Sequence, residues 1–185
     1  GDYRVNDPVY NSHGFLIHDY FFAKTLDKLR AGGVAAYITT KGTMDKESTK
    51  VREFLFKKAE LLGAIRLPNT AFKNAGTKVT ADILFLQKRE REIENPEWTT
   101  ITEDAQGFRI NSYFVQHPEM ILGTMQEISG PYGMETTCVE KEGVPLGERL
   151  RAAISHITGH IPERVEEERA EFRYEAEQPT DAPDA

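Results

Sequence analysis

The chain has a single cysteine, Cys138, among its 185 residues. One cysteine excludes an internal disulfide bond and any zinc site built from several cysteines, and it suits a reducing compartment. We therefore expect a cytoplasmic protein in which Cys138 is a small apolar residue of a strand. The chain also begins at Gly1 rather than at a methionine, so we expect a processed, engineered or fragmentary chain.

Long apolar runs are absent as well. No stretch approaches the roughly 20 residues that a membrane-spanning helix needs, and the N-terminus has no signal-peptide pattern. A hydrophobic content of 39% is nevertheless enough for a folded core, and the length suits one domain with a small appendage. We therefore expect no membrane partner.

Basic residues are too few to balance the acidic ones, and the net charge is −7. Nine acidic and three basic residues fall within residues 163–185, so this segment accounts for nearly all of the excess. The rest of the chain is close to neutral, which neither excludes a DNA partner nor provides a basic stripe for one. We expect residues 163–185 to form an acidic, partly disordered tail.

Hydrophobic spacing predicts a mixture of helices and strands. The expected helices cover residues 15–30, 46–59 and 147–162. The expected strands cover residues 34–40, 61–68, 79–88, 98–103 and 108–115. The alternation of helix and strand with short connections is typical of an α/β layered sheet. The loop of residues 69–78 is too short to hold a covering helix, so the two strands that it joins should pair antiparallel as a hairpin.

Most candidate catalytic patterns fail on spacing. Lys41, Gly42 and Thr43 lack the spacing of a phosphate-binding loop. His156 and His160 lie four residues apart on an expected helix, but no third ligand accompanies them, so we expect no metal site. His18 and Asp19 form a base and orienter pair only in sequence, because adjacent residues on a helix point apart.

The loop between the last two buried strands carries an aromatic residue, Phe72, among polar and basic residues. Its neighbours include Lys73, Asn74 and Lys78. An aromatic side chain among amides and amines suits a flat ligand with polar edges, and enzymes that modify bases hold the extruded base against such a side chain. The alternative is that Phe72 packs beneath its own hairpin.

The stretch from FLIHDYFFAKTLDKLRAGGVAAYITTKG to AIRLPNTAFKNAGTKVTADILFLQK resembles the second half of an N6-adenine DNA methyltransferase domain. It is similar to the methylase subunits of type I restriction-modification systems and to the methylase part of large methylase–helicase proteins of bacterial mobile elements. The resemblance covers residues 10–90 and continues more loosely beyond them. It implies the C-terminal half of a Rossmann-like, S-adenosylmethionine-dependent methyltransferase sheet that ends in an antiparallel hairpin.

The resemblance also implies roles for individual residues. Phe72 corresponds to the aromatic that stacks on the flipped adenine, with Asn74 beside it. Lys41 and Thr43 would border the pocket of the target base, because they follow the strand of residues 34–40. Leu16 and His18 stand where relatives carry an acidic or amide residue and an aromatic, which implies contacts with S-adenosylmethionine.

The catalytic motif of this family, Asn/Asp/Ser-Pro-Pro-Tyr/Phe, does not occur in the sequence, and neither does the glycine-rich cofactor loop. The resemblance therefore implies that residues 1–90 are half of a catalytic domain and are inactive alone. Residues 91–162 would be a small β-containing extension with a C-terminal helix, followed by the tail of residues 163–185. The implied partners are DNA, the missing N-terminal half of the domain and a fused helicase.

Two other functions remain open from the sequence. In one, the chain is a complete, non-catalytic α/β interaction module. In the other, it is a degenerate methylase domain that only grips DNA for a fused helicase. Likeness of fold alone does not decide between these and an enzyme.

Overall fold

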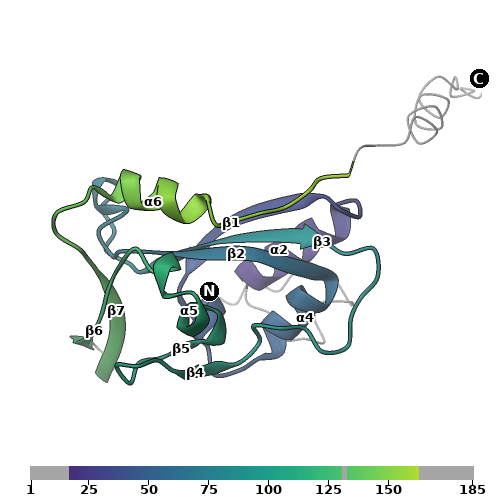
Figure 1. Ribbon diagram of the computed structural model, residues 1–185. Coiled ribbons are helices and arrows are strands. Elements are labelled where there is room, and N and C mark those ends of the chain that lie inside the picture. The colour runs from purple at the N-terminus through teal and green to yellow at the C-terminus, as the bar shows by residue number, and fades with distance from the viewer. Residues whose placement is uncertain (1–16, 131–132, 163–185) are drawn as a thin grey trace, which may run out of the picture.

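The computed structural model describes residues 17–130 and 133–162 as a mixed α/β protein with three small antiparallel sheets (Figure 1). The helices are α2 (Ile17–Lys28), α3 (Gly42–Asp45), α4 (Lys50–Lys58), α5 (Ser112–Gln116) and α6 (Leu146–Ile154), with short 3-10 turns η1 (Lys73–Ala75) and η2 (Pro118–Met120). The strands are β1 (Val34–Thr40), β2 (Ala59–Leu67), β3 (Ala81–Lys88), β4 (Ile101–Glu103), β5 (Arg109–Asn111), β6 (Gly123–Gly130) and β7 (Gly133–Glu140). Within these residues, none of the helices is long and apolar enough to span a bilayer.

The main sheet has the order β1-β3-β2, and β3 runs antiparallel to both neighbours. The expected hairpin of the last two strands is therefore confirmed as β2 and β3, whose register places Arg66 opposite Asp82. On its other side β1 has no partner strand among the described residues. Ile38, near the end of this edge strand, is 61% exposed.

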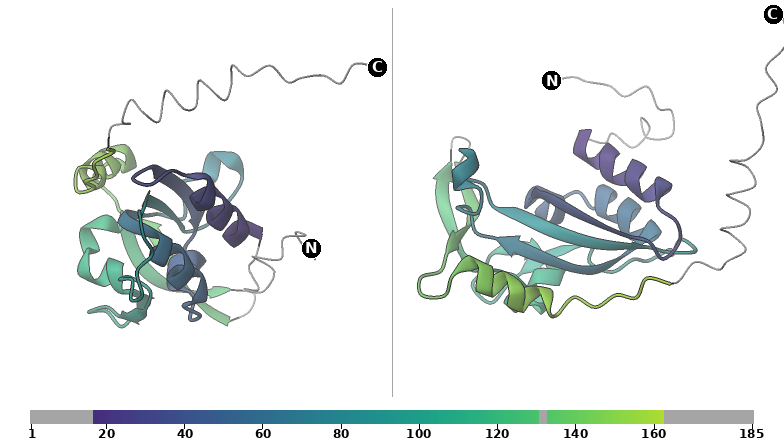
Figure 2. Two further views of the ribbon diagram at one scale, coloured as in Figure 1. Left: turned by 90° about the vertical axis from the view of Figure 1, so that its right-hand side faces the viewer. Right: turned by 90° about the horizontal axis from the view of Figure 1, so that it is seen from above.

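Helices cover the two faces of the main sheet. Figure 2 shows α2 and α4 on one side, and α6 with the chain that follows it on the other. One hydrophobic cluster joins the first and second halves of the described chain, because it contains Phe22 and Leu84 from the first half together with Phe114, Met125 and Ala153 from the second. The two halves therefore share one core.

Two elements end earlier in the structure than the sequence predicted. The strand expected at residues 108–115 ends at Asn111, because the Asn111 side chain accepts a hydrogen bond from the backbone N–H of Tyr113 and caps α5. The helix expected at residues 147–162 ends at Ile154. His156 and His160 therefore do not share a helical face, and the residues after α6 run along the sheet instead.

The chain after α6 is held by the sheet it crosses. The side-chain amide of Gln87 donates to the His160 carbonyl at 2.6 Å, and the Arg30 guanidinium donates to the Pro162 carbonyl at 3.0 Å. Gly63 leaves room for Ile157, since a Cβ atom at Gly63 would lie 2.8 Å from Ile157 Cγ1. Extended backbone bonded to the sheet thus replaces the last expected helical turns.

We predict that Gly63→Ala lowers the free energy of unfolding by about 1–3 kcal/mol, because overpacking forces Ile157 away from the sheet. The matched control is Gly147→Ala, since a Cβ at Gly147 meets open space within α6. The control should leave stability unchanged or raise it by up to about 1 kcal/mol. Urea unfolding of both variants is the measurement, and equal effects would contradict the packing that we describe.

Candidate functional site

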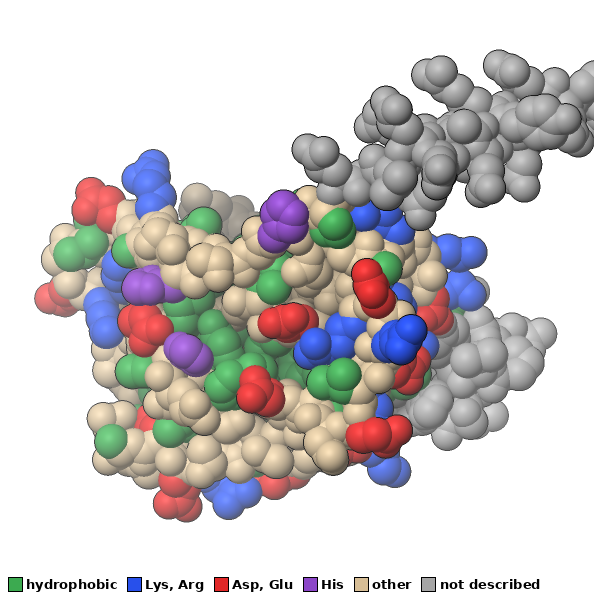
Figure 3. All heavy atoms as spheres, turned by 45° about the vertical axis from the view of Figure 1, so that its right-hand side comes forward, with side chains coloured by type: hydrophobic (Ala, Val, Ile, Leu, Met, Phe, Trp, Pro, Cys, Tyr) green, Lys and Arg blue, Asp and Glu red, His purple; other side chains and the backbone are tan. Residues whose placement is uncertain are grey.

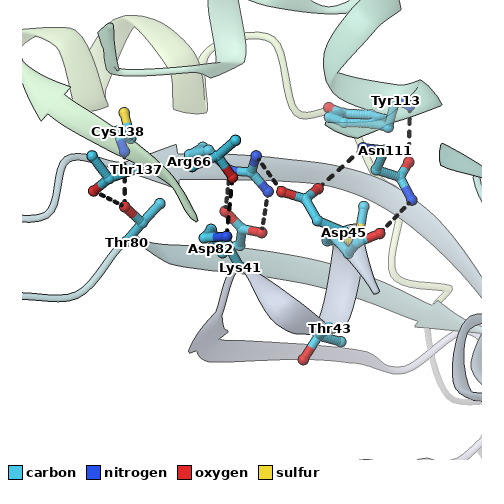
Figure 4. A network of polar contacts seen from close by, with 12 residues as sticks. Lys41, Thr43, Asp45, Arg66, Thr80, Asp82, Asn111, Tyr113, Thr137 and Cys138 are labelled. Carbon is cyan, nitrogen blue, oxygen red and sulfur yellow. Dashed lines mark hydrogen bonds and ion pairs between the residues drawn. The ribbon is translucent and has the colours of Figure 1, made fainter. Parts of the chain in front are cut away.

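A buried ion cluster lies where β2 and β3 approach the turn of α3. The Arg66 guanidinium donates to both carboxylate oxygens of Asp82, at 2.8 and 2.9 Å (Figure 4). Its Nη1 atom lies 2.8 Å from Asp45 Oδ2 as a second ion pair. The Phe114 ring lies 4.2 Å from the guanidinium carbon and completes the surroundings of the charge. The side chains of Arg66 and Asp82 have no exposed surface.

Burial and pairing act in opposite directions on this cluster. Burial lowers the pKa of the Arg66 guanidinium, but the carboxylates of Asp82 and Asp45 outweigh it and hold that pKa above its ordinary value. Burial raises the pKa of Asp82, and the contact with Arg66 opposes this increase. The arginine therefore remains charged, and the stability of the fold depends on keeping both carboxylates beside it.

Asp45 extends the cluster to a distant part of the chain. Its Oδ1 atom accepts a hydrogen bond from the backbone N–H of Asn111 at 3.0 Å. The Asn111 side chain in turn donates to the carbonyls of Met44 and Trp98, at 3.1 and 2.9 Å. Trp98 adopts φ of 62°, in the left-handed region that a non-glycine residue rarely occupies. The short strands β4 and β5 are thereby fixed to the turn that follows β1.

The buried side chain of Arg52 also holds the turn of residues 43–46. Its guanidinium donates to the carbonyls of Thr43, Lys46 and Thr99, at 3.2, 2.7 and 2.7 Å. Burial lowers the pKa of Arg52, and Asp45 is the first of the acidic groups that oppose this decrease. Three backbone carbonyls bonded to one rigid guanidinium fix the path of residues 43–46.

Two hollows share residues 40–42 in their lining. The smaller hollow, of about 280 Å³, is lined by His18, Asp19, Thr43 and the following turn. The larger hollow, of about 630 Å³, lies between that turn, the loop after β2 and the ribbon of β6 and β7, which we call the β6–β7 ribbon. Thr40, Lys41 and Gly42 line both hollows.

The smaller hollow brings together three residues that the sequence analysis selected. His18, Lys41 and Thr43 all line it, although the Thr43 side chain is buried and its hydroxyl lies 2.7 Å from that of Thr39. The expectation that His18 and Asp19 point apart is wrong, because His18 Nε2 lies 3.2 Å from Asp19 Oδ1. The long imidazole side chain spans the angle between adjacent helical positions. Leu16 lies outside the described residues.

The two residues expected in the base pocket from the loop after β2 are Phe72 and Asn74. Phe72 is half-buried and packs against the hydrophobic core, while Asn74 is exposed on η1. Neither is among the residues that line the two hollows. The strand register places the loop that carries Phe72 at the same end of the sheet as Lys41, because Thr40 and Leu67 are both paired with Ala81.

Sequence reasoning missed the residues that the β6–β7 ribbon brings to the larger hollow. Asn69 donates from its side-chain amide to Thr137 Oγ1 at 3.0 Å, and that hydroxyl lies 3.1 Å from the Thr80 hydroxyl. The only sequence signal for Asn69 was its place after a proline that ends the strand, in the same loop as Phe72. Thr137 gave none, because its partner Asn69 lies 68 residues away in sequence.

Cys138 follows Thr137 in the β6–β7 ribbon. It lies in β7 and has no exposed surface, as expected of a small apolar residue in a strand. Burial raises the pKa of its thiol to about 11, so the thiol is protonated at neutral pH. Its backbone N–H donates to Thr80 Oγ1 at 2.9 Å. Cys138 therefore contributes packing and backbone hydrogen bonds to the wall of the hollow, and no nucleophile.

Charge on the described surface is mixed. Figure 3 shows acidic and basic side chains interspersed around exposed hydrophobic ones on one face, with no gathering of a single sign. The larger hollow has the same character, since Lys41 and Lys78 line it together with Glu135 and Glu140. Hydroxyl and amide groups and the apolar side chains of Val79, Ile128 and Val139 complete its lining. Such a surface suits a ligand recognised by hydrogen bonds more than one held by charge alone.

Comparison with known proteins adds an independent finding. Residues 2–112 match the family model described as N-6 DNA methylase, and they make up more than half of the chain. The chain is also similar to "Defense against restriction protein B" of Escherichia phage P1, with 35% identity over 75 residues. These residues are 40% of this chain but span only 3% of that protein's length. No solved structure matches the chain significantly.

We predict that Arg66→Met lowers the free energy of unfolding by about 3–5 kcal/mol, because it leaves two buried carboxylates without a counter-charge. The control is Arg109→Met, whose ion pair with Glu47 is largely exposed and should be worth less than about 1 kcal/mol. Guanidinium unfolding of the two variants provides the comparison. A loss for Arg66→Met no larger than that of the control would refute the central role of the cluster.

Proposed function

The chain belongs to the N-6 DNA methylase family, and we propose that it forms the target-base side of a DNA adenine-N6 methyltransferase. In this proposal the complete domain transfers a methyl group to an adenine turned out of the duplex, in the cytoplasm. The observation that carries the proposal is the junction of two loops from the matched region. The backbone N–H of Lys41, after β1, donates to the Thr80 carbonyl, before β3, at 3.1 Å.

This junction makes the larger hollow a candidate for the base. A nucleobase presents donors and acceptors around a flat ring, and an enzyme reads them by hydrogen bonds from a shaped pocket. The larger hollow offers the ammonium of Lys41 and hydroxyl and amide groups from Asn69, Thr70 and Thr136. Phe72 lies in the loop between Thr70 and Lys78, two residues that line the hollow. Phe72 does not line the hollow itself, so its proposed role is to stack on the base at the mouth of the hollow, with Asn74 beside it.

The smaller hollow is the proposed side of the cofactor. S-adenosylmethionine would supply the methyl group on a sulfonium centre and also carries an amine, a carboxylate and hydroxyls. The buried carboxylate of Asp19 and the side chains of His18 and Thr43 fit a cationic ligand with hydroxyl groups. Leu16 remains a proposed contact that lies outside the described residues. The role of these side chains is to bind and orient.

The sheet supports a larger parent fold. β3 runs antiparallel between β1 and β2. This arrangement is the one expected of the hairpin that ends a Rossmann-like methyltransferase sheet. We propose that the sheet continues at the edge of β1 that has no partner strand among the described residues, where further strands of the catalytic domain would pair. Residues 91–162 extend this half-domain, and their shared core with the first part supports a permanent attachment.

The wider setting is also a proposal. The name of the phage P1 protein concerns defence against restriction, and the short match leaves almost all of that protein without a counterpart here. We propose that this chain belongs to a longer protein of a mobile element or a restriction-modification system that acts on DNA. A fused helicase remains a prediction from the sequence resemblance.

We predict that the 185-residue chain alone transfers no methyl group, because its sequence lacks the Asn/Asp/Ser-Pro-Pro-Tyr/Phe motif that polarises the adenine amino group. Incubation with tritiated S-adenosylmethionine and adenine-containing DNA should give counts equal to those of a protein-free control. Incorporation that rises with time and protein concentration would contradict the assignment of chemistry to residues outside this chain.

We predict that Phe72→Ala weakens binding of single-stranded, adenine-containing DNA by roughly 5-fold to 100-fold, the usual effect of removing one aromatic stacking partner. Fluorescence of 2-aminopurine placed in the oligonucleotide measures both the affinity and the stacking. The matched control is Phe108→Ala, which removes another half-buried ring packed on the core, outside the loop after β2.

Equal losses in the two phenylalanine variants would refute the stacking role of Phe72. Such a result, with DNA still bound, would favour the module that only grips the DNA backbone. Circular dichroism of each variant establishes that both remain folded before affinities are compared.

A further inference from the structure

The β6–β7 ribbon lies outside the region that matches the family, yet it forms one wall of the larger hollow. Figure 1 shows the ribbon at one end of the main sheet. Its two strands pair in register from Gly123 and Glu140 to Gly130 and Gly133. The residues nearest the sheet, Thr137 and Cys138, are buried, whereas those farther out become exposed.

The ribbon is joined to the loop after β2 by three hydrogen bonds. The backbone N–H of Asn69 donates to the Cys138 carbonyl at 2.7 Å, and its side-chain amide donates to Thr137 at 3.0 Å. The Thr70 hydroxyl donates to Glu140 Oε2 at 2.7 Å. A fourth bond, from the backbone N–H of Cys138 to the Thr80 hydroxyl, joins the ribbon to the residue before β3. These bonds therefore fix the β6–β7 ribbon against the loop after β2 and the residue before β3, which form other parts of the hollow.

One further bond crosses the hollow itself. Lys41 Nζ, from the turn after β1, donates to Thr136 Oγ1 at 3.1 Å. A lysine side chain loses considerable rotamer freedom when it is held in one position, so an unsupported ammonium at this place would sample many orientations. The Lys41 ammonium has three N–H donors. One of them is bonded to the Thr136 hydroxyl, which leaves the other two for a ligand.

We propose that Thr136 is a positioning residue that holds the Lys41 ammonium in the larger hollow for an acceptor atom of the bound DNA strand. This inference rests on the proposed function, because it assigns the hollow to DNA. It goes beyond the family resemblance, because Thr136 lies outside the matched residues. The acceptor is a phosphate oxygen or an acceptor on a base edge, which share the same hydrogen-bond chemistry.

A double-mutant cycle on the whole 185-residue chain tests the inference, with binding of a single-stranded, adenine-containing oligonucleotide as the measurement. Lys41→Ala should weaken binding about tenfold or more, because it removes a charge-assisted contact. Thr136→Val keeps the size and strand preference of the residue but removes the hydroxyl, and should weaken binding roughly threefold to tenfold. In the Lys41→Ala background, Thr136→Val should have no further effect.

Two companion variants separate positioning from a structural role. Thr136→Ser restores the hydroxyl and should bind within about twofold of the unaltered chain. Thr124→Val alters an exposed threonine of the same ribbon that does not line the larger hollow, and should leave affinity unchanged. The dependence of affinity on salt identifies the acceptor, because loss of a phosphate contact in Lys41→Ala lowers the slope by about one while loss of a base contact does not.

Additive effects of Lys41→Ala and Thr136→Val, or failure of Thr136→Ser to restore binding, would overturn the inference while the proposed function stands. If the unaltered chain binds none of the oligonucleotides, the proposed function falls and the inference falls with it.

Discussion

The guanidinium of Arg66 holds this structure together, because a fully buried positive charge must keep its two carboxylates wherever the chain places them. Asp82 is its cross-strand neighbour, so the pair fixes the register of β2 against β3. A slip by one residue would turn Arg66 to the opposite face and leave three charges unpaired in the core. Hydrophobic strands such as these would tolerate several registers without it. The charge therefore selects one alignment among apolar strands that otherwise look alike.

Asp45 carries the same constraint beyond the sheet. It connects the arginine to the turn after β1 and, through Asn111, to the strands β4 and β5. Arg52 then fixes the turn from its other side by bonding three carbonyls. The loops that border both hollows thus start from positions set by two buried arginines. Side chains that bind ligands need this kind of support, since small errors in placement weaken recognition.

The sequence predicted the three strands of the main sheet because each has a local signal, a short and mainly apolar run. A loop too short for a helix also predicted the antiparallel pairing of β2 with β3, but nothing in the sequence analysis placed β3 between β1 and β2. Arg66 and Asp82 were visible as charged residues within apolar strands, and that signal could have predicted their pairing. The β6–β7 ribbon and the extended chain after α6 could not be predicted in this way, since their positions depend on contacts with residues far away in sequence.

The candidate site shows the same division. The resemblance implied that Lys41 and Thr43 border the base pocket and that His18 contacts the cofactor, whereas all three residues line the smaller hollow. Asn69, Thr136 and Thr137 escaped notice because hydroxyl and amide residues in loops and exposed strands are common, and only the fold gives them neighbours. The contact of His18 with Asp19 was missed because helical spacing describes where side chains start and not how far they reach.

Thr40, Lys41 and Gly42 have a geometric consequence of their own, since these three consecutive residues line both hollows. A displacement of this segment therefore changes the lining of both hollows at once. A molecule bound in one hollow lies against residues that also border the other.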